Sequence, residues 1–369
     1  MILTVVIRMP DGVPWNLLMV YHCVLCFFMF YGIHVENNFN QNKKEMFNIL
    51  KILVYIPSIL SLIGLILAIL KNEFKFYGHT LGVKSHRLVG IYENSNTLGL
   101  LSVLSIISCC IFLKKNIEQK RNLPIWVLIC CILINLICLF LSDSNGSFLF
   151  LAVYIVSMIF CKFVKYKGIK TLEKTEVKTL ILMLSCVFIV FSLIFLKALF
   201  QNIFNILIKS IHLHTQNIKI DSSIEIGRGN YEITSGRNLL ILQGLRLFFR
   251  FPIMGIGRGN LVYYSNRFLL DRLDYEDLHN GYLTILVSWG ALGFFFIMFF
   301  LVGICALLLK TLFKSKNGVL GIYSSLFSLM VAYSVYSLFE ITLLSSITFS
   351  CDFFWVILGY TVCYALNFK

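Results

Sequence analysis

Residues 227–293 form the one long stretch of the chain whose side chains could do polar chemistry. The stretch holds seven arginines, one histidine and no lysine. A guanidinium group presents a rigid fork of donors that matches phosphate oxygens in pairs, whereas a lysine ammonium acts as a point charge. The composition therefore predicts a site for a large phosphorylated substrate at a membrane surface. The alternative is that these arginines bind the headgroups of ordinary phospholipids.

The single histidine of this stretch has two glycines at helical spacing behind it. Gly290 and Gly293 follow His279 by eleven and fourteen residues. At 100° per residue both offsets return to within about 40° of His279 on a helix. Small residues let a neighbouring helix approach closely. The pattern predicts a histidine held rigidly at the rim of two packed helices, or a plain packing seam that ends in an interfacial histidine.

The rest of the chain is too apolar for an ordinary globular domain. Of its 369 residues, 58% are hydrophobic and 14% are charged, whereas charged residues make up about a quarter of a soluble domain. A membrane-spanning helix needs about 20 mainly apolar residues. By that measure the sequence predicts an all-α, polytopic transmembrane bundle of about nine spans: Trp15–Ile33, Ile49–Leu70, Thr97–Leu113, Leu123–Leu141, Ser147–Cys161, Thr179–Leu196, Tyr282–Leu309, Val319–Phe339 and Ser350–Leu366.

The short connections predict the orientation of these spans. Four connections are rich in lysine, and positive-inside bias places them in the cytoplasm: Val35–Asn48, Lys114–Arg121, Lys162–Lys178 and Lys310–Lys316. The chain then starts outside and ends inside, which leaves open the loss of upstream helices. Nine of the ten arginines fall on the outer side. The formal charge of +14 is accounted for by these membrane-facing groups, so we predict no nucleic-acid partner.

Three parts follow from this arrangement. Residues 1–196 carry the first six spans, residues 197–281 form a large extracytoplasmic loop, and residues 282–369 carry the last three spans. The expected location is the cell membrane, as a multi-pass protein with the large loop outside.

The large loop contains a predicted amphipathic helix. Ser235 is its predicted N-cap and Pro252 ends it after about residue 251. Gln243, Arg246 and Arg250 recur on one face of this helix. We expect it to lie in the membrane interface, with its apolar side in lipid and its arginines toward water.

A glycine-rich segment follows the amphipathic helix. Gly255, Gly257 and Gly259 alternate around Arg258. A dinucleotide-binding loop would need a preceding strand, and the sequence predicts none here. We expect a turn, which would also let backbone N–H groups and Arg258 approach a phosphate.

The predicted spans carry no ionisable residue of the kind that marks an ion pathway. Lys197, Glu340 and Asp352 lie at outer helix ends rather than in span centres. This pattern disfavours an ion-coupled transporter, or a flippase with a charged cavity. His22, inside the first span, is expected to be a hydrogen-bonded core residue.

The twelve cysteines fall in or beside apolar runs, as small buried hydrophobes do. Cys23 and Cys26 form a C-x-x-C pair without further ligands nearby in the sequence, so we predict no zinc or redox site there. A second metal hypothesis rests on Asp274, Glu276 and Asp277 beside His279. Adjacent carboxylates in a solvated loop usually remain solvated, so we predict neither a metal nor a cofactor.

The residues around His279 carry a resemblance to a known family. His279-Asn280, nine residues, Gly290, two residues and Gly293 resemble the H-N-x9-G-x-x-G signature of the bacterial O-antigen ligase and O-antigen (capsular polysaccharide) polymerase superfamily. These proteins are integral membrane glycosyltransferases with GT-C-like helical folds.

Two further stretches agree with the resemblance, which covers residues 87–309. Arg87-Leu-Val-Gly90 resembles the family's R-x-x-G segment. Ser235-Gly-Arg237, followed by Phe251-Pro252 and Gly255-Ile-Gly257, resembles the stretch that leads into its large outer loop. One departure lies at Ser142-Asp-Ser-Asn-Gly146, where Asn145 stands in place of the arginine that many relatives have.

The resemblance implies a metal-independent, inverting glycosyl transfer from an undecaprenyl-diphosphate-linked oligosaccharide donor to a glycan acceptor. It assigns His279 to positioning and deprotonating the attacking hydroxyl, with Asn280 or Asp277 orienting it. Arg237 would stabilise the charge that develops on the diphosphate. Further candidates for the diphosphate are Arg87, Arg246, Arg250 and Arg258.

Polymerisation of lipid-linked repeat units is the favoured reaction, with ligation to lipid A core or another acceptor as the alternative. A chain-length regulator is a potential partner. Two alternatives come from other classes: a lipid-linked glycan flippase or exporter, and a non-enzymatic scaffold subunit. The flippase would need a polar path through the spans, and a scaffold would tolerate loss of His279.

Overall fold

The computed structural model describes residues 13–35, 39–70, 73–77, 79–84, 87–92, 94–119, 123–167, 237–268, 277–314, 320–344 and 346–367. The predicted sixth span, Ser235, Asp274 and Glu276 lie outside these residues. The chain forms two compact units, which are described separately. The first comprises Met1–Met46, Ser157–Tyr166 and Glu232–Lys369, and the second Phe47–Val156 and Lys167–Tyr231. The predicted division at residues 196 and 281 stays a prediction.

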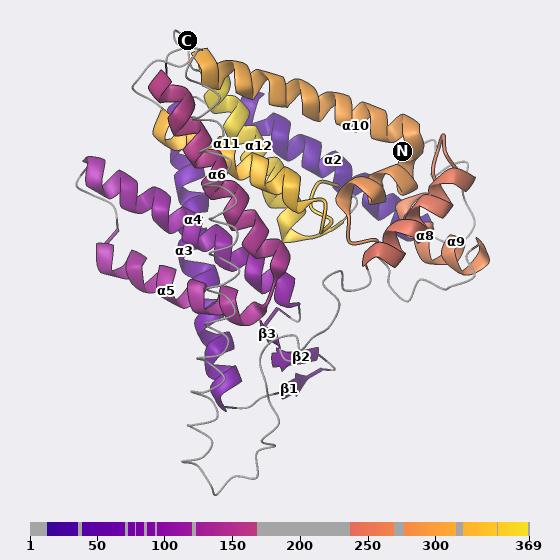
Figure 1. The fold of residues 1–369 in the computed structure, drawn as a ribbon, viewed down its shortest axis with the longest axis horizontal. Coiled ribbons are helices and arrows are strands. Elements are labelled where there is room, and N and C mark those ends of the chain that lie inside the picture. Colours follow the sequence, from indigo (N-terminus) through magenta and orange to yellow (C-terminus); the bar gives the residue numbers. More distant parts are fainter. Residues whose placement is uncertain are drawn as a thin grey trace, which may run out of the picture. The chain divides into compact units, whose positions relative to one another are not determined.

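Seven helices of the described residues are long and apolar enough to cross a membrane. Each contains or overlaps a predicted span, and the helices are labelled in Figure 1. The span predicted over 319–339 is the shorter helix α11 (Leu320–Tyr336), with 17 residues. The seven are α2 (Val13–Val35), α3 (Phe39–Leu70), α4 (Ser95–Gln119), α5 (Ile125–Ser142), α6 (Asn145–Lys167), α10 (Gly281–Lys314) and α12 (Phe349–Asn367).

The second unit also contains a small antiparallel sheet, so the all-α prediction was wrong here. Strands β1 (Glu73–Phe76), β2 (His79–Lys84) and β3 (Arg87–Gly90) pair in that order. Polar and apolar residues alternate along β1, which is the period of a strand with one buried face. The segment is too short and too polar to continue a spanning helix, so the chain returns as a hairpin.

A buried polar network joins three helices of the second unit. Asn135 of α5 donates through Nδ2 to Ser58 Oγ of α3 at 2.7 Å and to Ser105 Oγ of α4 at 3.1 Å. Its Oδ1 accepts from Ser61 Oγ at 3.1 Å. Hydrogen bonds between neutral side chains can hold helices together where water does not compete. The network thus fixes the register of α3, α4 and α5.

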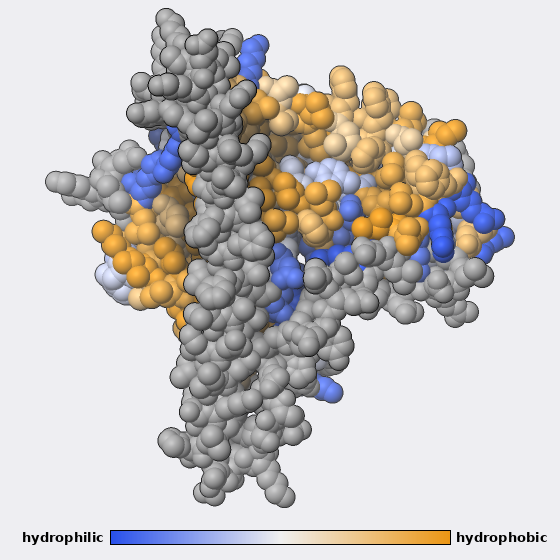
Figure 2. All heavy atoms as spheres, viewed as in Figure 1, coloured by the Kyte–Doolittle hydropathy of each residue, from blue (hydrophilic) through white to orange (hydrophobic). Residues whose placement is uncertain are grey.

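In the first unit, α2 lies alongside α12 (Figure 1). Aromatic rings fill the seam between α2, α10 and α12: Phe27 and Trp355 have centroids 4.9 Å apart, and Phe300 stacks on Trp355 at 6.1 Å. The other side of α10 exposes Phe295 and Phe299, and hydrophobic side chains gather over this helix in Figure 2. An exposed row of phenylalanines on a long apolar helix is a lipid-facing surface.

Helix α10 breaks at Gly290. This residue has φ 68° and ψ −176°, a conformation that is essentially restricted to glycine. The break frees backbone groups on both sides of it. Val287 O and Ser288 O lose helical donors, and the N–H groups of Ala291 and Leu292 lose helical acceptors.

The glycine-rich segment after α8 (Arg237–Arg250) supplies the missing partners. Ile256 N–H donates to Val287 O at 3.1 Å, and Gly257 N–H donates to Ser288 O at 2.9 Å. In return, Ala291 N–H donates to Pro252 O at 2.7 Å. The turn predicted here therefore docks backbone to backbone against the broken helix.

The glycine stripe predicted on a straight helix is therefore wrong. A Cβ on Gly290 would lie 2.2 Å from Ile253 O, so this glycine contacts a loop rather than a neighbouring helix. A Cβ on Gly293 would lie 2.5 Å from Trp289 Cβ, one turn back in α10. The calculation at 100° per residue fails because the helix does not continue through Gly290.

We predict that Gly290→Ala lowers the free energy of unfolding by more than about 2 kcal/mol, because it adds backbone strain to a steric overlap. The matched control is Gly303→Ala in the same helix, where a Cβ would meet nothing within 4 Å. Thermal unfolding of the purified protein in detergent measures both. Equal melting temperatures for the two variants would contradict the break at Gly290.

Candidate functional site

A compact apolar core positions the polar residues of the first unit. It joins α8, the glycine-rich segment, α9 (Leu261–Phe268) and the start of α10. Gly244 lets α8 come close to α10, since a Cβ at Gly244 would lie 2.8 Å from Leu283 Cδ2. Its fully or largely buried members are Leu240, Leu247, Ile256, Leu261, Tyr264, Leu278, Leu283 and Val287.

The predicted amphipathic helix is present as α8, but its faces differ from the prediction. Gln243 is buried, whereas Arg246 and Arg250 are exposed, so the three do not share one solvated face. The inner apolar side of α8 packs on α10 rather than on lipid. Leu242 and Phe249 remain exposed and provide the apolar surface that could enter the interface.

Glu340 joins two predicted site residues. Arg237 Nη2, at the start of α8, donates to Glu340 Oε1 at 3.0 Å. The other carboxylate oxygen, Oε2, lies 3.4 Å from His279 Nδ1. One carboxylate thus contacts both the proposed phosphate-binding cation and the proposed base. The Arg237 and Glu340 side chains are only 23% and 16% exposed, so water screens this pair weakly.

Backbone contacts hold Glu340 beside the start of α10. Gly281 N–H donates to Ser337 O at 2.7 Å, and Glu340 N–H donates to Tyr336 O at 3.1 Å. A Cβ on Gly281 would lie 3.3 Å from both Glu340 O and Ser337 O. The sequence placed Glu340 only at an outer helix end and gave it no role. The sequence offered one signal for a role of Glu340, which is that it is a single carboxylate at the end of a span without other charges.

His279 itself sits in a left-handed backbone conformation, with φ 46°. Such a conformation costs a residue with a Cβ roughly 1–2 kcal/mol. It lets the chain turn from Asp277 into α10 with the imidazole held toward Glu340. The imidazole side chain is about one-third exposed, so a substrate can reach it.

Asn280 caps α10 rather than orienting the histidine. Its Oδ1 accepts from Leu283 N–H at 2.9 Å, and its backbone carbonyl accepts from Thr284 Oγ1 at 2.8 Å. Asparagine is among the preferred N-cap residues for this reason. The carboxylate beside the His279 imidazole is that of Glu340.

Asp277 is also engaged elsewhere, in an ion pair with Arg258. The Arg258 side chain is only 11% exposed, and its turn is anchored where Gly259 N–H donates to Asn16 Oδ1 at 2.7 Å. The pair ties the glycine-rich segment to the residues just before His279. Of the four residues in the metal hypothesis, only Asp277 and His279 are among the described residues. The Asp277 carboxylate faces the Arg258 guanidinium.

The remaining predicted arginines lie in two settings. Arg250 places its guanidinium carbon 4.1 Å from the centroid of the Phe268 ring, a favourable cation–π distance. Arg246 is exposed on the same helix. Both can face lipid phosphates or a diphosphate, and their predicted role stays a prediction.

Arg87 has a structural task in the second unit. Its Nε donates to Ser142 O at 2.9 Å, and its Nη2 donates to Asp143 O at 3.1 Å and to Asn96 Oδ1 at 2.9 Å. The guanidinium thus caps the carboxyl end of α5, where cations are stabilising. Asp143 closes that helix in a left-handed conformation, with φ 50°. These contacts explain Arg87 without a diphosphate, whose binding there stays a prediction.

The arrangement around Glu340 can do acid–base chemistry. When Nδ1 of His279 donates to Glu340, Nε2 carries the lone pair that accepts a proton, as in other carboxylate-oriented histidines. A separation of 3.4 Å is long, but such contacts often tighten when substrate binds. Arg237 donates only to Glu340 within the described part of the chain, so other guanidinium donors can meet an oxyanion.

We predict that Asn280→Ser and Asn280→Asp keep both stability and activity, because each can cap α10. Asn280→Ala should cost about 1 kcal/mol of unfolding free energy. Thermal unfolding and glycan transfer, measured on the same preparations, separate the two properties. Loss of transfer in a stable Asn280→Ser protein would show that the amide has a direct role at the site.

Comparison with known proteins identifies the part of the chain that holds most of this site. Residues 130–298 match the family model described as O-antigen ligase. Arg237, His279 and Gly290 lie inside the match, whereas Arg87 and Glu340 lie outside it. No curated protein and no solved structure matches the chain. With seven apolar helices among the described residues, the chain is a multi-pass membrane protein, and its residues 130–298 form a domain that is similar to the O-antigen ligases.

Proposed function

We propose that the protein transfers glycans from an undecaprenyl-diphosphate carrier at the outer face of the cell membrane, and that it joins repeat units into a longer polysaccharide. The observation that carries this proposal is the shared contact of Arg237 and His279 with Glu340. Arg237 and His279 fall within the O-antigen ligase domain, and the contact pairs a proton acceptor with an anion binder.

In the proposed reaction, an acceptor sugar hydroxyl attacks the anomeric carbon of the donor from the face opposite the diphosphate. A carbon–oxygen bond forms to the acceptor, and the bond to the diphosphate oxygen breaks, so the configuration inverts. The hydroxyl proton passes to Nε2 of His279, and Glu340 stabilises the imidazolium that results. Arg237 stabilises the negative charge that grows on the leaving diphosphate.

An apolar cavity supports a lipid-linked donor. It has a volume of about 190 Å³ and runs between α10, α11 and α12. Tyr282, three residues after His279, lines it together with Met298, Phe327 and Phe354. Its size suits part of an isoprenoid tail, which would keep the diphosphate beside the arginines. The exposed Arg246 and Arg250 of α8 are further candidates to contact that diphosphate or neighbouring headgroups.

Ligation to lipid A core or another acceptor is the alternative reaction, and the description of the matched family favours it. Both reactions use the same donor chemistry and differ in the acceptor. The lysine and arginine distribution supports an outer position for residues 197–281, which is where this proposal needs the site to be.

The experiment is a gel analysis of surface glycans from a deletion strain that expresses wild type, His279→Ala, Arg237→Ala or Glu340→Gln at matched membrane levels. We expect each variant to leave single repeat units where wild type gives a ladder. The transfer rate should fall by at least about a hundredfold, which is typical for loss of an acid–base or oxyanion-stabilising group.

Arg267→Ala is the matched control, since Arg267 is an exposed arginine of the same outer region that contacts Tyr263 and Phe268. It should give a normal ladder. Long chains that accumulate on the lipid carrier in the site variants would favour ligation. Wild-type glycans from all three site variants would refute the catalytic assignment.

A further inference from the structure

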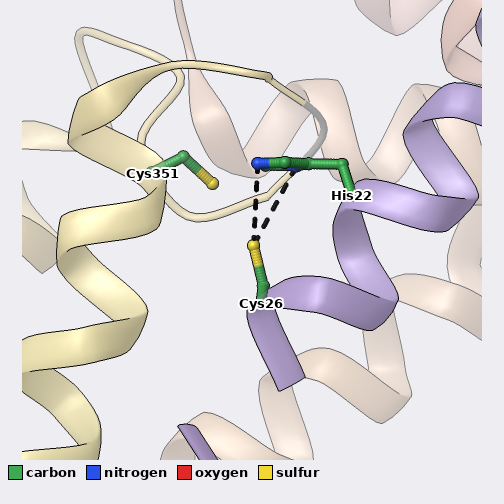
Figure 3. A group of neighbouring side chains, drawn as sticks. All are labelled: His22, Cys26 and Cys351. Carbon is green, nitrogen blue, oxygen red and sulfur yellow. Dashed lines mark hydrogen bonds between the residues drawn. The ribbon is translucent and has the colours of Figure 1, made fainter. Parts of the chain in front are cut away.

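A second cluster of reactive side chains lies in the first unit, apart from the residues assigned to glycan transfer. His22 and Cys26 come from α2, and Cys351 comes from the first turn of α12 (Figure 3). One nitrogen of His22 and the two sulfurs lie within 4.8 Å of one another. All three residues are buried, with exposed fractions of 5%, 0% and 0%.

We propose that His22, Cys26 and Cys351 bind a structural transition-metal ion of the zinc class. Both ring nitrogens of His22 lie 3.9 Å from Cys26 Sγ. In a tetrahedral zinc site, bond lengths of 2.0–2.3 Å place neighbouring ligand atoms roughly 3.5–3.8 Å apart. Small side-chain rotations therefore bring the three donors to bonding distance of one ion.

The donor types select the metal. Two thiolates and an imidazole favour zinc and similar ions over magnesium or calcium, which prefer oxygen ligands. Binding releases the two thiol protons to water, and a dication balances the two thiolates that remain. A neutral assembly of this kind is tolerable in a buried site, where a single uncompensated charge would be costly.

Asp352 completes the arrangement as a positioning residue. Its Oδ1 lies 2.7 Å from His22 Nε2. A carboxylate on one ring nitrogen leaves the lone pair on the other nitrogen, and metal-bound histidines are commonly oriented this way. The bond to Asp352 thus leaves Nδ1 of His22 for the metal, and a water can fill the fourth position.

From the sequence we expect His22 to be only a hydrogen-bonded core residue, and that expectation does not include its cluster with Cys26 and Cys351. The sequence drew attention to the pair Cys23 and Cys26, yet the helical spacing that matters is His22 to Cys26. Residues four apart share one face of a helix. The third ligand, Cys351, is distant in sequence and becomes visible only when α12 packs on α2.

The position of the cluster connects it to Glu340. Cys351 Sγ lies 3.3 Å from Leu343 O, which also accepts from Trp355 Nε1 at 2.6 Å. Leu343 belongs to the segment that directly follows Glu340. A metal that fixes Cys351 against α2 would therefore stabilise the end of the connection that carries Glu340, while Trp355 still satisfies the Leu343 carbonyl.

The test is metal analysis of the full-length protein, purified in detergent under reducing conditions and reconstituted with Zn²⁺ or Co²⁺. We expect about one tightly held ion per chain. The cobalt form should show the thiolate-to-metal charge-transfer absorption that two cysteine ligands produce. Chelation should lower the melting temperature.

Variants assign the ligands. Cys26→Ser and Cys351→Ser should lose the ion and the charge-transfer band, and Asp352→Asn should weaken cobalt affinity about 10–100-fold. Cys363→Ser is the control, because Cys363 is a buried cysteine of the same helix whose sulfur contacts Asn42 and Asn367.

Two outcomes would overturn the proposal: wild type that takes up no ion under reducing conditions, or equal metal loss in Cys363→Ser. The cobalt spectrum of wild type decides the question even if a variant fails to fold.

Discussion

The part of the first unit that holds the candidate site depends on one constraint, which is that backbone hydrogen-bonding groups within an apolar medium need partners inside the protein. Helix α10 breaks at Gly290 and exposes such groups in the midst of an apolar helix. The segment from Pro252 to Gly257 satisfies them by pairing with Val287, Ser288 and Ala291. The broken helix and the glycine-rich segment are therefore one structural element, although 33 residues separate Gly257 from Gly290.

The polar site follows from this element. Docking of the glycine-rich segment fixes Arg258, which pairs with Asp277 just before His279. The same core holds α8 against α10 and so positions Arg237. Glu340 then meets both residues from the turn that follows α11, because Gly281 lets that turn approach the start of α10. A rigid scaffold of this kind is what preorganised electrostatic stabilisation requires.

The sequence predicted the membrane class and most of the helices because long apolar runs have few alternative structures. It also pointed to the stretch that holds His279 and Arg237, since the arginine bias and the glycine spacing are local signals. The role of Gly290 was misassigned because a helix break depends on a distant loop, and periodicity assumes that the helix continues.

The sequence could not predict the contacts of Glu340 either, because they also join segments that are distant in the chain. Glu340 lies 61 residues from His279 and 103 from Arg237, so no spacing rule joins them. Asn280 was assigned to the histidine because it is adjacent in sequence, whereas its side chain caps the helix that begins next to it. Arg87 had a conspicuous charge, and only the structure shows that helix carbonyls bind it.

In the proposed mechanism Glu340 acts through His279, and a double-mutant cycle on transfer rate tests this role most directly. The purified protein would be supplied with a synthetic undecaprenyl-diphosphate oligosaccharide, and rates would be compared for wild type, Glu340→Gln, His279→Ala and the double variant. We predict that Glu340→Gln slows wild type by roughly 10²–10⁴-fold, as loss of a histidine-orienting carboxylate does elsewhere, but changes the His279→Ala protein by less than about threefold. An equal loss in both backgrounds would contradict the claim and would show that Glu340 acts independently of the histidine.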